Sequence, residues 1–174
     1  RDSVASRGLG DVYKRQRVYY SAFSPIPDAA HALPLAAPPT VREHRLYQAD
    51  WLMRFYGFTH DEIVPTSQQG MLALDMDPKL AWALAHRERF PVNLNTAPRE
   101  LLLRVPGFGV QTVDRLLAAR RVRRLRHADL ARLHVPLKKV LPFVEAADYR
   151  PGRALEAADL AAQLAPPPVQ RSLF

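Results

Sequence analysis

The residues best suited to chemistry are two glycines in a turn between two apolar helical segments. Residues 100–117 read ELLLRVPGFGVQTVDRLL, with the turn at residues 106–109. Pro106 is expected to end the first helix, and Gly107 and Gly109 permit positive φ angles and close approach of another molecule. Without side chains there, the N–H groups of the turn and of the next helix start can point at one phosphate oxygen. Such a contact recognises an anionic backbone without reading base sequence.

Apolar periodicity on both sides of this turn predicts the two helices that position it. Its members are Leu101, Leu102 and Val105 before the turn and Val110, Val113, Leu116 and Leu117 after it. Phe108 is expected to fill the gap between the helices. Asn95 or Thr96 is expected to cap the first helix, with Pro98 in its first turn.

Basic side chains cluster at the end of the second predicted helix. They are Arg120, Arg121, Arg123, Arg124 and Arg126. The neighbouring acidic residues are too few to pair with all five, so several arginines are expected to reach solvent or phosphate. Phosphate contacts would make affinity fall with salt, with a log–log slope of about −0.9 per phosphate neutralised on duplex DNA. A solvated basic surface is the alternative interpretation.

The charge of the chain is concentrated in the same region. The 174 residues carry 25 Lys and Arg against 17 Asp and Glu, a net charge of +8. Residues 99–150 hold twelve basic and five acidic side chains, whereas residues 17–98 hold seven and eight. The chain has no cysteine, which excludes disulfides and thiolate metal ligands, and its histidines lack metal-binding spacing. With no apolar stretch of about 20 residues, we expect a cytoplasmic protein without membrane association.

The glycine turn and its helices resemble the helix-hairpin-helix family, whose turn carries Pro-Gly-Ile-Gly or close variants. The resemblance implies that the amides of Gly107, Gly109 and Val110 bind a phosphate. It also implies a side-chain donor just after them, at Gln111 or Thr112. Many family members have Lys where this chain has Gln111, so one positive charge of the usual pattern is missing.

A second, weaker helix pair is expected over residues 129–143, with its turn at HVPLKK, residues 134–139. It resembles a degenerate half of a tandem helix-hairpin-helix domain over residues 91–150. This turn has no glycine, so it serves either packing alone or a phosphate contact through its two lysines. The candidate DNA-binding residues of the domain are Gly107, Phe108, Gly109, Val110, Gln111, Thr112, Arg120, Arg121, Arg123, Arg124, Lys138 and Lys139.

Capping signals predict further helices upstream. They are a capping box at Thr40 and Glu43 for a helix over residues 41–56, another at Thr59 and Glu62, and an Asp77 cap for a helix over residues 79–86. Gly57 is expected to end the first helix in the left-handed conformation. Leu80, Ala81 and Leu84 are expected to be buried.

Residues 17–23, RVYYSAF, alternate in polarity and predict one strand. A single strand cannot form a sheet, so we expect a sheet-forming part upstream of Arg17. The strand followed by REHRLYQADWL, DPKLAWAL and RVPGFG resembles the C-terminal part of the DNA modification and repair radical S-adenosylmethionine proteins. The resemblance covers nearly all of residues 17–174. It implies a mainly α fold in which residues 17–90 are the last strand and exit helices of a truncated (β/α) barrel.

In that family the barrel binds a [4Fe–4S] cluster through a Cys-x3-Cys-x2-Cys loop and uses S-adenosylmethionine. The family is encoded beside a uracil-DNA-glycosylase-like protein, which is therefore an expected partner. Because this chain lacks cysteine, we expect it to hold no cofactor and to lack the radical-generating step, which the full-length parent would perform. The catalytic residues stay unassigned.

Both ends of the chain have features of their own. Residues 1–16 include SRGLGDVYKRQ, which resembles a translated sequencing adapter, so this segment is expected to be non-native. Residues 151–174 predict one short helix, residues 154–164, and a flexible tail. The final QRSLF resembles the bacterial sliding-clamp-binding pentapeptide and implies contacts from Gln170, Leu173 and Phe174.

Three functions fit these features. The first is a module that binds duplex DNA for a radical enzyme of DNA repair or modification. The second is a radical enzyme acting on RNA or a nucleotide, with the hairpin domain contacting RNA or protein. The third is a scaffold without salt-dependent nucleic-acid binding. The basic block, the glycine turn and the clamp-like peptide together favour DNA.

Overall fold

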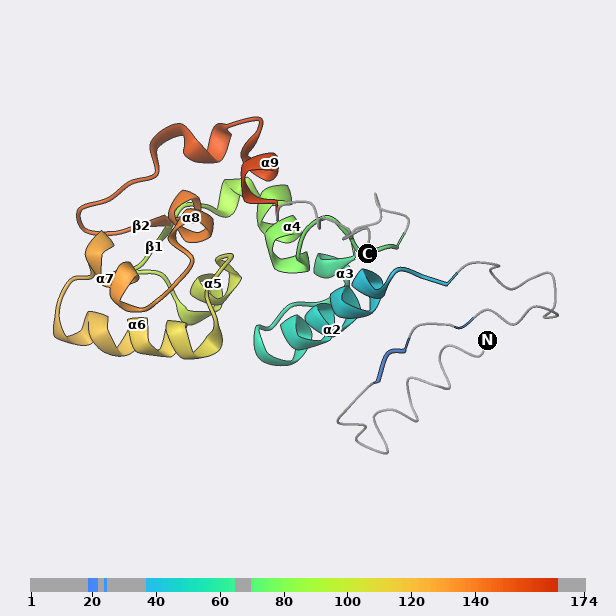
Figure 1. The fold of residues 1–174 in the computed structure, drawn as a ribbon. Coiled ribbons are helices and arrows are strands. Elements are labelled where there is room, and N and C mark those ends of the chain that lie inside the picture. Colours follow the sequence, from blue (N-terminus) through green and yellow to red (C-terminus); the bar gives the residue numbers. More distant parts are fainter. Residues whose placement is uncertain (1–18, 22–23, 25–36, 65–69, 166–174) are drawn as a thin grey trace, which may run out of the picture. The chain divides into compact units, whose positions relative to one another are not determined.

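The computed structural model describes residues 19–21, 24, 37–64 and 70–165 (Figure 1). Contacts divide the chain into two units, residues 1–43 and 44–174, and the core and the candidate site described below lie in the second. The described architecture is mainly helical. Its elements are α2 (Thr40–Phe55), α3 (His60–Ile63), α4 (Pro78–Ala85), η2 (Arg87–Arg89), β1 (Val92–Asn93), α5 (Arg99–Arg104), α6 (Val110–Val122), α7 (His127–Arg132), α8 (Leu137–Val140), η3 (Leu141–Phe143), β2 (Val144–Glu145), η4 (Gly152–Glu156) and α9 (Leu160–Leu164). None of the described helices is long and apolar enough to cross a membrane.

Two short strands flank the segment that holds the two predicted turns, and they pair with each other. β1 and β2 pair in parallel, with Val92 opposite Val144 and Asn93 opposite Glu145. The side-chain amide of Asn93 also donates to the Glu145 carboxylate across the strand pair at 2.5 Å. Parallel strands need a long crossover, and here that connection contains α5 to α8. The pairing therefore fixes the start of this helical segment beside its end.

The helices α5 to α8 share one hydrophobic core. Its most buried members are Leu102, Val105, Phe108, Val113, Leu116, Leu130, Val140 and Phe143. Of the predicted apolar faces on either side of the turn, Leu102, Val105, Val113 and Leu116 are buried, whereas Leu101, Val110 and Leu117 are half-buried against the same core. Phe108 is buried, as expected for a residue between the two helices.

Several predicted helix signals are confirmed upstream of this core. Thr59 and Glu62 form the expected capping box, in which the Thr59 amide donates to the Glu62 carboxylate at 2.9 Å. Asp77 caps α4 by accepting a hydrogen bond from the Leu80 amide at 2.9 Å. Gly57 follows α2 with φ of 70°, the left-handed conformation predicted for it.

Two predicted caps are wrong. Thr40 is the first residue of α2 rather than the residue before it. Asn95 does not cap α5, because its side chain is bound to the backbone of Leu125 instead. Pro98 occupies the N-cap position of α5 without any side-chain hydrogen bond.

The two ends of the described chain also depart from expectation. Residues 19–21 lie in no strand, and the rest of the predicted strand is outside the described residues. The expected helix over residues 154–164 is split into η4 and α9. The helical backbone ends at Ala157, whose ψ is 127°, and at this break the Arg87 guanidinium donates to the carbonyls of Leu155 and Ala157 at 2.9 and 3.0 Å.

The burial of α4 is only partly as expected. Leu80 is buried, whereas Ala81 and Leu84 are half-buried. Trp82 is buried instead and packs its ring edge-on against Phe58, with centroids 5.3 Å apart.

Candidate nucleic-acid interface

Gly107, in the α5–α6 turn (residues 106–109), is required by the fold itself. Its φ is +88°, a conformation that L side chains rarely adopt. A Cβ atom there would lie 2.8 Å from Val140 Cγ2 and 3.0 Å from Pro136 Cγ. The glycine therefore allows the α5–α6 turn to pack against the start of α8.

Gly109 is different, because neither conformation nor space requires a glycine there. Its φ and ψ are −93° and 165°, ordinary extended values for an N-cap residue. The nearest atom to a Cβ placed on it would be Tyr56 Oη, 3.9 Å away. The missing side chain instead leaves the space in front of the α6 N-terminus open.

A group of backbone donors surrounds that open space. The first hydrogen bond of α6 runs from the Val113 amide to the Gly109 carbonyl at 3.0 Å, so the preceding amides stand outside the helical ladder. No side chain caps this helix. Within the described part of the chain, five amides of the turn and first helical turn have no acceptor: Gly107, Gly109, Val110, Gln111 and Thr112. Unpaired N–H groups at the N-terminus of a helix suit an oxyanion.

A buried lysine orients this turn from behind. Lys79 of α4 is only 7% exposed, and its Nζ donates to the Phe108 carbonyl at 2.7 Å. In a trans peptide the C=O and the following N–H point in opposite directions. The N–H of Gly109 is therefore directed away from Lys79.

The charge of Lys79 is tuned by its surroundings. Burial lowers the pKa of Lys79 to about 7; the Asp77 carboxylate opposes this shift, and the nearby charge of Lys139 adds to it. Asp77 also forms an ion pair with Lys139 of α8. At neutral pH Lys79 consequently carries only part of a positive charge.

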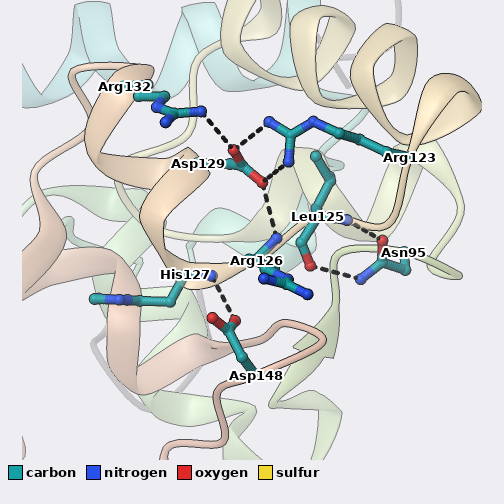
Figure 2. A network of polar contacts seen from close by, with 8 residues as sticks. All are labelled: Asn95, Arg123, Leu125, Arg126, His127, Asp129, Arg132 and Asp148. Atoms are coloured by element: carbon teal, nitrogen blue, oxygen red, sulfur yellow. Dashed lines mark hydrogen bonds and ion pairs between the residues drawn. The ribbon is translucent and has the colours of Figure 1, made fainter.

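The predicted arginines fall into two groups. Arg120 donates to the Ala97 carbonyl at 2.6 Å and is half-buried. Arg123 makes two hydrogen bonds to the Asp129 carboxylate, at 2.6 and 3.0 Å (Figure 2). Arg121 and Arg124 are exposed, and no hydrogen bond or ion pair joins their side chains to the described residues. The side chain of Arg126 is likewise exposed and makes no hydrogen bond or ion pair with the described residues. Arg121, Arg124 and Arg126 are thus the arginines of this group available to a ligand.

Asp129 is the centre of the network that uses Arg123. It is buried, accepts from the Arg126 amide at 2.9 Å, and lies 3.6 Å from the Arg132 guanidinium (Figure 2). The hydrogen bonds from Arg123 and from the Arg126 amide hold the pKa of Asp129 below its usual value. This stabilisation is present at neutral pH and is lost as the pH falls through the lowered pKa. The network fixes the link between α6 and α7.

Two side-chain contacts to backbone anchor the same link (Figure 2). The Asn95 side chain accepts from the Leu125 amide at 2.7 Å and donates to its carbonyl at 3.1 Å. The Asp148 carboxylate accepts from the His127 amide at 2.7 Å. These contacts are structural and explain why the link is ordered although it is rich in arginine.

The α7–α8 turn (residues 133–136) has few free polar groups. His134 has a positive φ of 54° where the first turn has glycine. Pro136 lies against the position of Gly107, as described above. Of the two predicted lysines, Lys139 is paired with Asp77, whereas Lys138 is exposed and makes no ion pair with the described residues.

Sequence reasoning missed two polar residues of this site, one buried and one exposed. Lys79 could have been found from its position in DPKLAWAL, directly after a capping aspartate and among apolar neighbours. Arg115 is exposed on α6 and lies one turn after Gln111, on the same side of the helix. Its spacing from the glycine turn was the available signal.

Other parts of the prediction lie beyond this surface. The predicted clamp-binding residues Gln170, Leu173 and Phe174, and the adapter-like residues 1–16, are outside the described residues. No protein-family model matches the chain, and comparisons with curated proteins and with solved structures give no match either.

Proposed function

We propose that residues 91–150 are a tandem helix-hairpin-helix module that binds duplex DNA through its phosphate backbone, without sequence preference. The module would serve a radical S-adenosylmethionine enzyme of DNA repair or modification. Among the described residues, the observation that carries the proposal is the group of amides without an acceptor in front of α6. The fold does not require a glycine at position 109, and its missing side chain leaves these amides accessible.

The chemistry of this group supports a phosphate as its ligand. Amides at a helix N-terminus combine hydrogen-bond donors with the positive end of the helix dipole. The amide of Gly109 is aimed outward by the bond that Lys79 makes to the preceding carbonyl. Backbone donors contact phosphate oxygens and not base edges, which supports binding without sequence preference.

The basic side chains support a polyanion. Arg115, Arg121, Arg124 and Lys138 are exposed and make no ion pair with the described residues. Arg120 and Arg123 support the fold instead, because both are bound within it. The number of phosphates neutralised should therefore be smaller than the count of basic residues suggests.

The radical enzyme of this proposal would need a [4Fe–4S] cluster, and this chain lacks the residues that would bind it. The cluster expected from the resemblance is held by cysteine thiolates, and the chain has no cysteine. The proposed role of these residues is accordingly DNA binding alone, with the glycosylase-like protein and the sliding clamp as proposed partners of the parent.

The test is competition binding by the full chain. Fluorescence anisotropy would compare a labelled DNA duplex with a scrambled duplex, the separated single strand and transfer RNA at several salt concentrations. We expect both duplexes to bind equally and log affinity to fall linearly with log salt, by about 0.9 per phosphate contacted.

Two results would contradict the proposal. Tighter binding of transfer RNA than of duplex DNA would assign the surface to RNA. Absence of salt-dependent nucleic-acid binding would leave a scaffold as the function of the module.

A further inference from the structure

Two large aromatic side chains on α2 are exposed beside the amide group. The side chains of Trp51 and Phe55 are 59% and 51% exposed. They are four residues apart, so they lie on the same side of the helix, and their ring centroids are 5.1 Å apart. The buried residues of α2 are Ala49 and Leu52, so the aromatic pair is not part of the core.

The aromatic pair forms one wall of an open groove. The groove has a volume of about 560 Å³ and is lined by Trp51, Phe55, Tyr56, Gly109, Val110, Gln111 and Thr112. One wall is thus aromatic, and the other is the start of α6 with its acceptor-free amides. Figure 1 shows the C-terminal end of α2 beside the start of α6. The volume is in the range of sites for small ligands.

Polar contacts hold the two walls in place. Arg104, at the end of α5, donates to the Gly57 carbonyl just after α2 at 3.2 Å. Arg104 also pairs with Glu62 of α3 at 2.8 Å and lies over the Phe58 ring at 4.4 Å. The end of α2 is therefore fastened to the helix that leads into the α5–α6 turn.

We propose that this groove binds one unpaired nucleotide of a DNA strand, with its base against Trp51 and Phe55 and its phosphate at the amides of α6. The inference rests on the proposed function and adds a ligand class to it. A nucleotide has an aromatic half and an anionic half, and the two walls of the groove complement these halves. A neutral peptide would offer only uncharged carbonyls to these amides, whereas a phosphate also brings negative charge to the positive end of the α6 dipole, which favours a nucleotide as the occupant.

The geometry favours an unpaired base over a duplex. In a duplex, each base is stacked between neighbours about 3.4 Å away along its strand, so its face is covered. The ring centroids of Trp51 and Phe55 are 5.1 Å apart and the rings are tilted by 56°, so a base cannot enter between them and contacts the pair with one exposed face. Aromatic side chains in single-strand sites bind bases whose faces are exposed. The expected substrate is thus a duplex with an adjoining single-stranded segment.

The experiment compares a blunt duplex with the same duplex carrying a short single-stranded tail of thymidines. Binding of each to the full chain is measured for the wild type, Trp51→Ala, Phe55→Ala and Trp51→Phe. Met53→Ala is the matched control, because Met53 is exposed on the same helix but does not line the groove. Emission of Trp51 gives a second signal, since the other tryptophan, Trp82, is buried.

We expect the wild type to bind the tailed duplex about tenfold more tightly than the blunt one. Trp51→Ala should remove most of this preference while blunt-duplex affinity stays within about twofold. Trp51→Phe and Met53→Ala should retain the preference. Tryptophan emission of the wild type should fall on addition of the tailed duplex and change little with the blunt one.

Equal affinity of the wild type for the two duplexes would overturn the inference, and so would a preference that survives in Trp51→Ala. In either case salt-dependent binding of the blunt duplex would leave the proposed function standing. A dimer that Trp51→Ala dissociates, together with no tail preference, would assign the groove to a second copy of the chain.

Discussion

The α5–α6 turn contains two glycines and, together with the first turn of α6, holds five amides without an acceptor among the described residues, whereas the α7–α8 turn contains no glycine. The second turn packs Pro136 and Val140 against the first, at the position of Gly107. Its Lys139 is paired with Asp77, beside the buried Lys79 that binds the Phe108 carbonyl. The two turns are therefore joined, with the second supporting the first from behind.

This comparison separates two uses of glycine in similar sequences. Gly107 makes room for a neighbouring helix of the same chain, whereas Gly109 leaves room outside the chain. Only the second use points to a ligand. The comparison also shows that a basic residue near a turn is not automatically a ligand contact, since Arg123 and Lys139 are paired with aspartates.

The largest expected effect is on stability at the contact between the turns. Gly107→Ala should lower the free energy of unfolding by about 2–4 kcal/mol, because the new Cβ meets Val140 and imposes a strained φ. Urea denaturation followed by circular dichroism measures the change. Gly109→Ala is the control and should cost less than about 1 kcal/mol. Equal stability of the two variants would show that the turns are not packed as described.

A smaller effect is expected from the buried lysine behind the first turn. Because the pKa of Lys79 is about 7 in the folded protein and 10.5 ordinarily, the unfolded chain binds more protons between these values. Stability should therefore rise with pH in this window, by about 2 kcal/mol from pH 7 to pH 9. In the Lys79→Met variant, the free energy of unfolding should rise less with pH over this window, because the titrating amine is gone. Parallel stability profiles of the variant and the wild type would mean that Lys79 is not buried as described.

The smallest effect is expected at the second turn. Lys138→Ala should change duplex affinity by less than about threefold and the salt slope by at most about 1, because this turn serves mainly for packing. Arg115→Ala, on the side of α6 that holds Gln111, should weaken binding more. Fluorescence anisotropy at several salt concentrations measures both. A larger loss from Lys138→Ala would make the α7–α8 turn a phosphate site of its own.

Local signals predicted much of this fold. The period of apolar residues in α5 and α6, the capping box at Thr59 and the left-handed Gly57 depend on residues close in sequence, and the structure has them. The wrong predictions involve partners far along the chain. The Asn95 side chain is bound to the backbone of Leu125, thirty residues away. The Arg87 guanidinium donates to the Leu155 carbonyl, sixty-eight residues away.

In the candidate site, too, the features that depend on neighbouring residues were predicted and those that depend on distant partners were not. The glycine turn was visible as a motif, because its conformation depends on adjacent residues. The roles of Arg120, Arg123 and Lys139 were not, since each depends on a tertiary partner. The aromatic wall of the groove also needed the structure, because the helical pattern alone did not place Trp51 beside α6.

The central claim concerns the amides in front of α6, and Gly109→Asp tests it most directly. The backbone of Gly109 has N-cap geometry and room for a side chain, so the new carboxylate should bind the nearby amides of the helix itself. The account predicts a more stable protein, by about 0.5–1 kcal/mol, that binds duplex DNA at least tenfold more weakly. Gly109→Asn, a neutral cap of the same shape, should weaken binding in the same direction. Gly109→Asp protein that gains stability yet binds duplexes as tightly as the wild type would contradict the account.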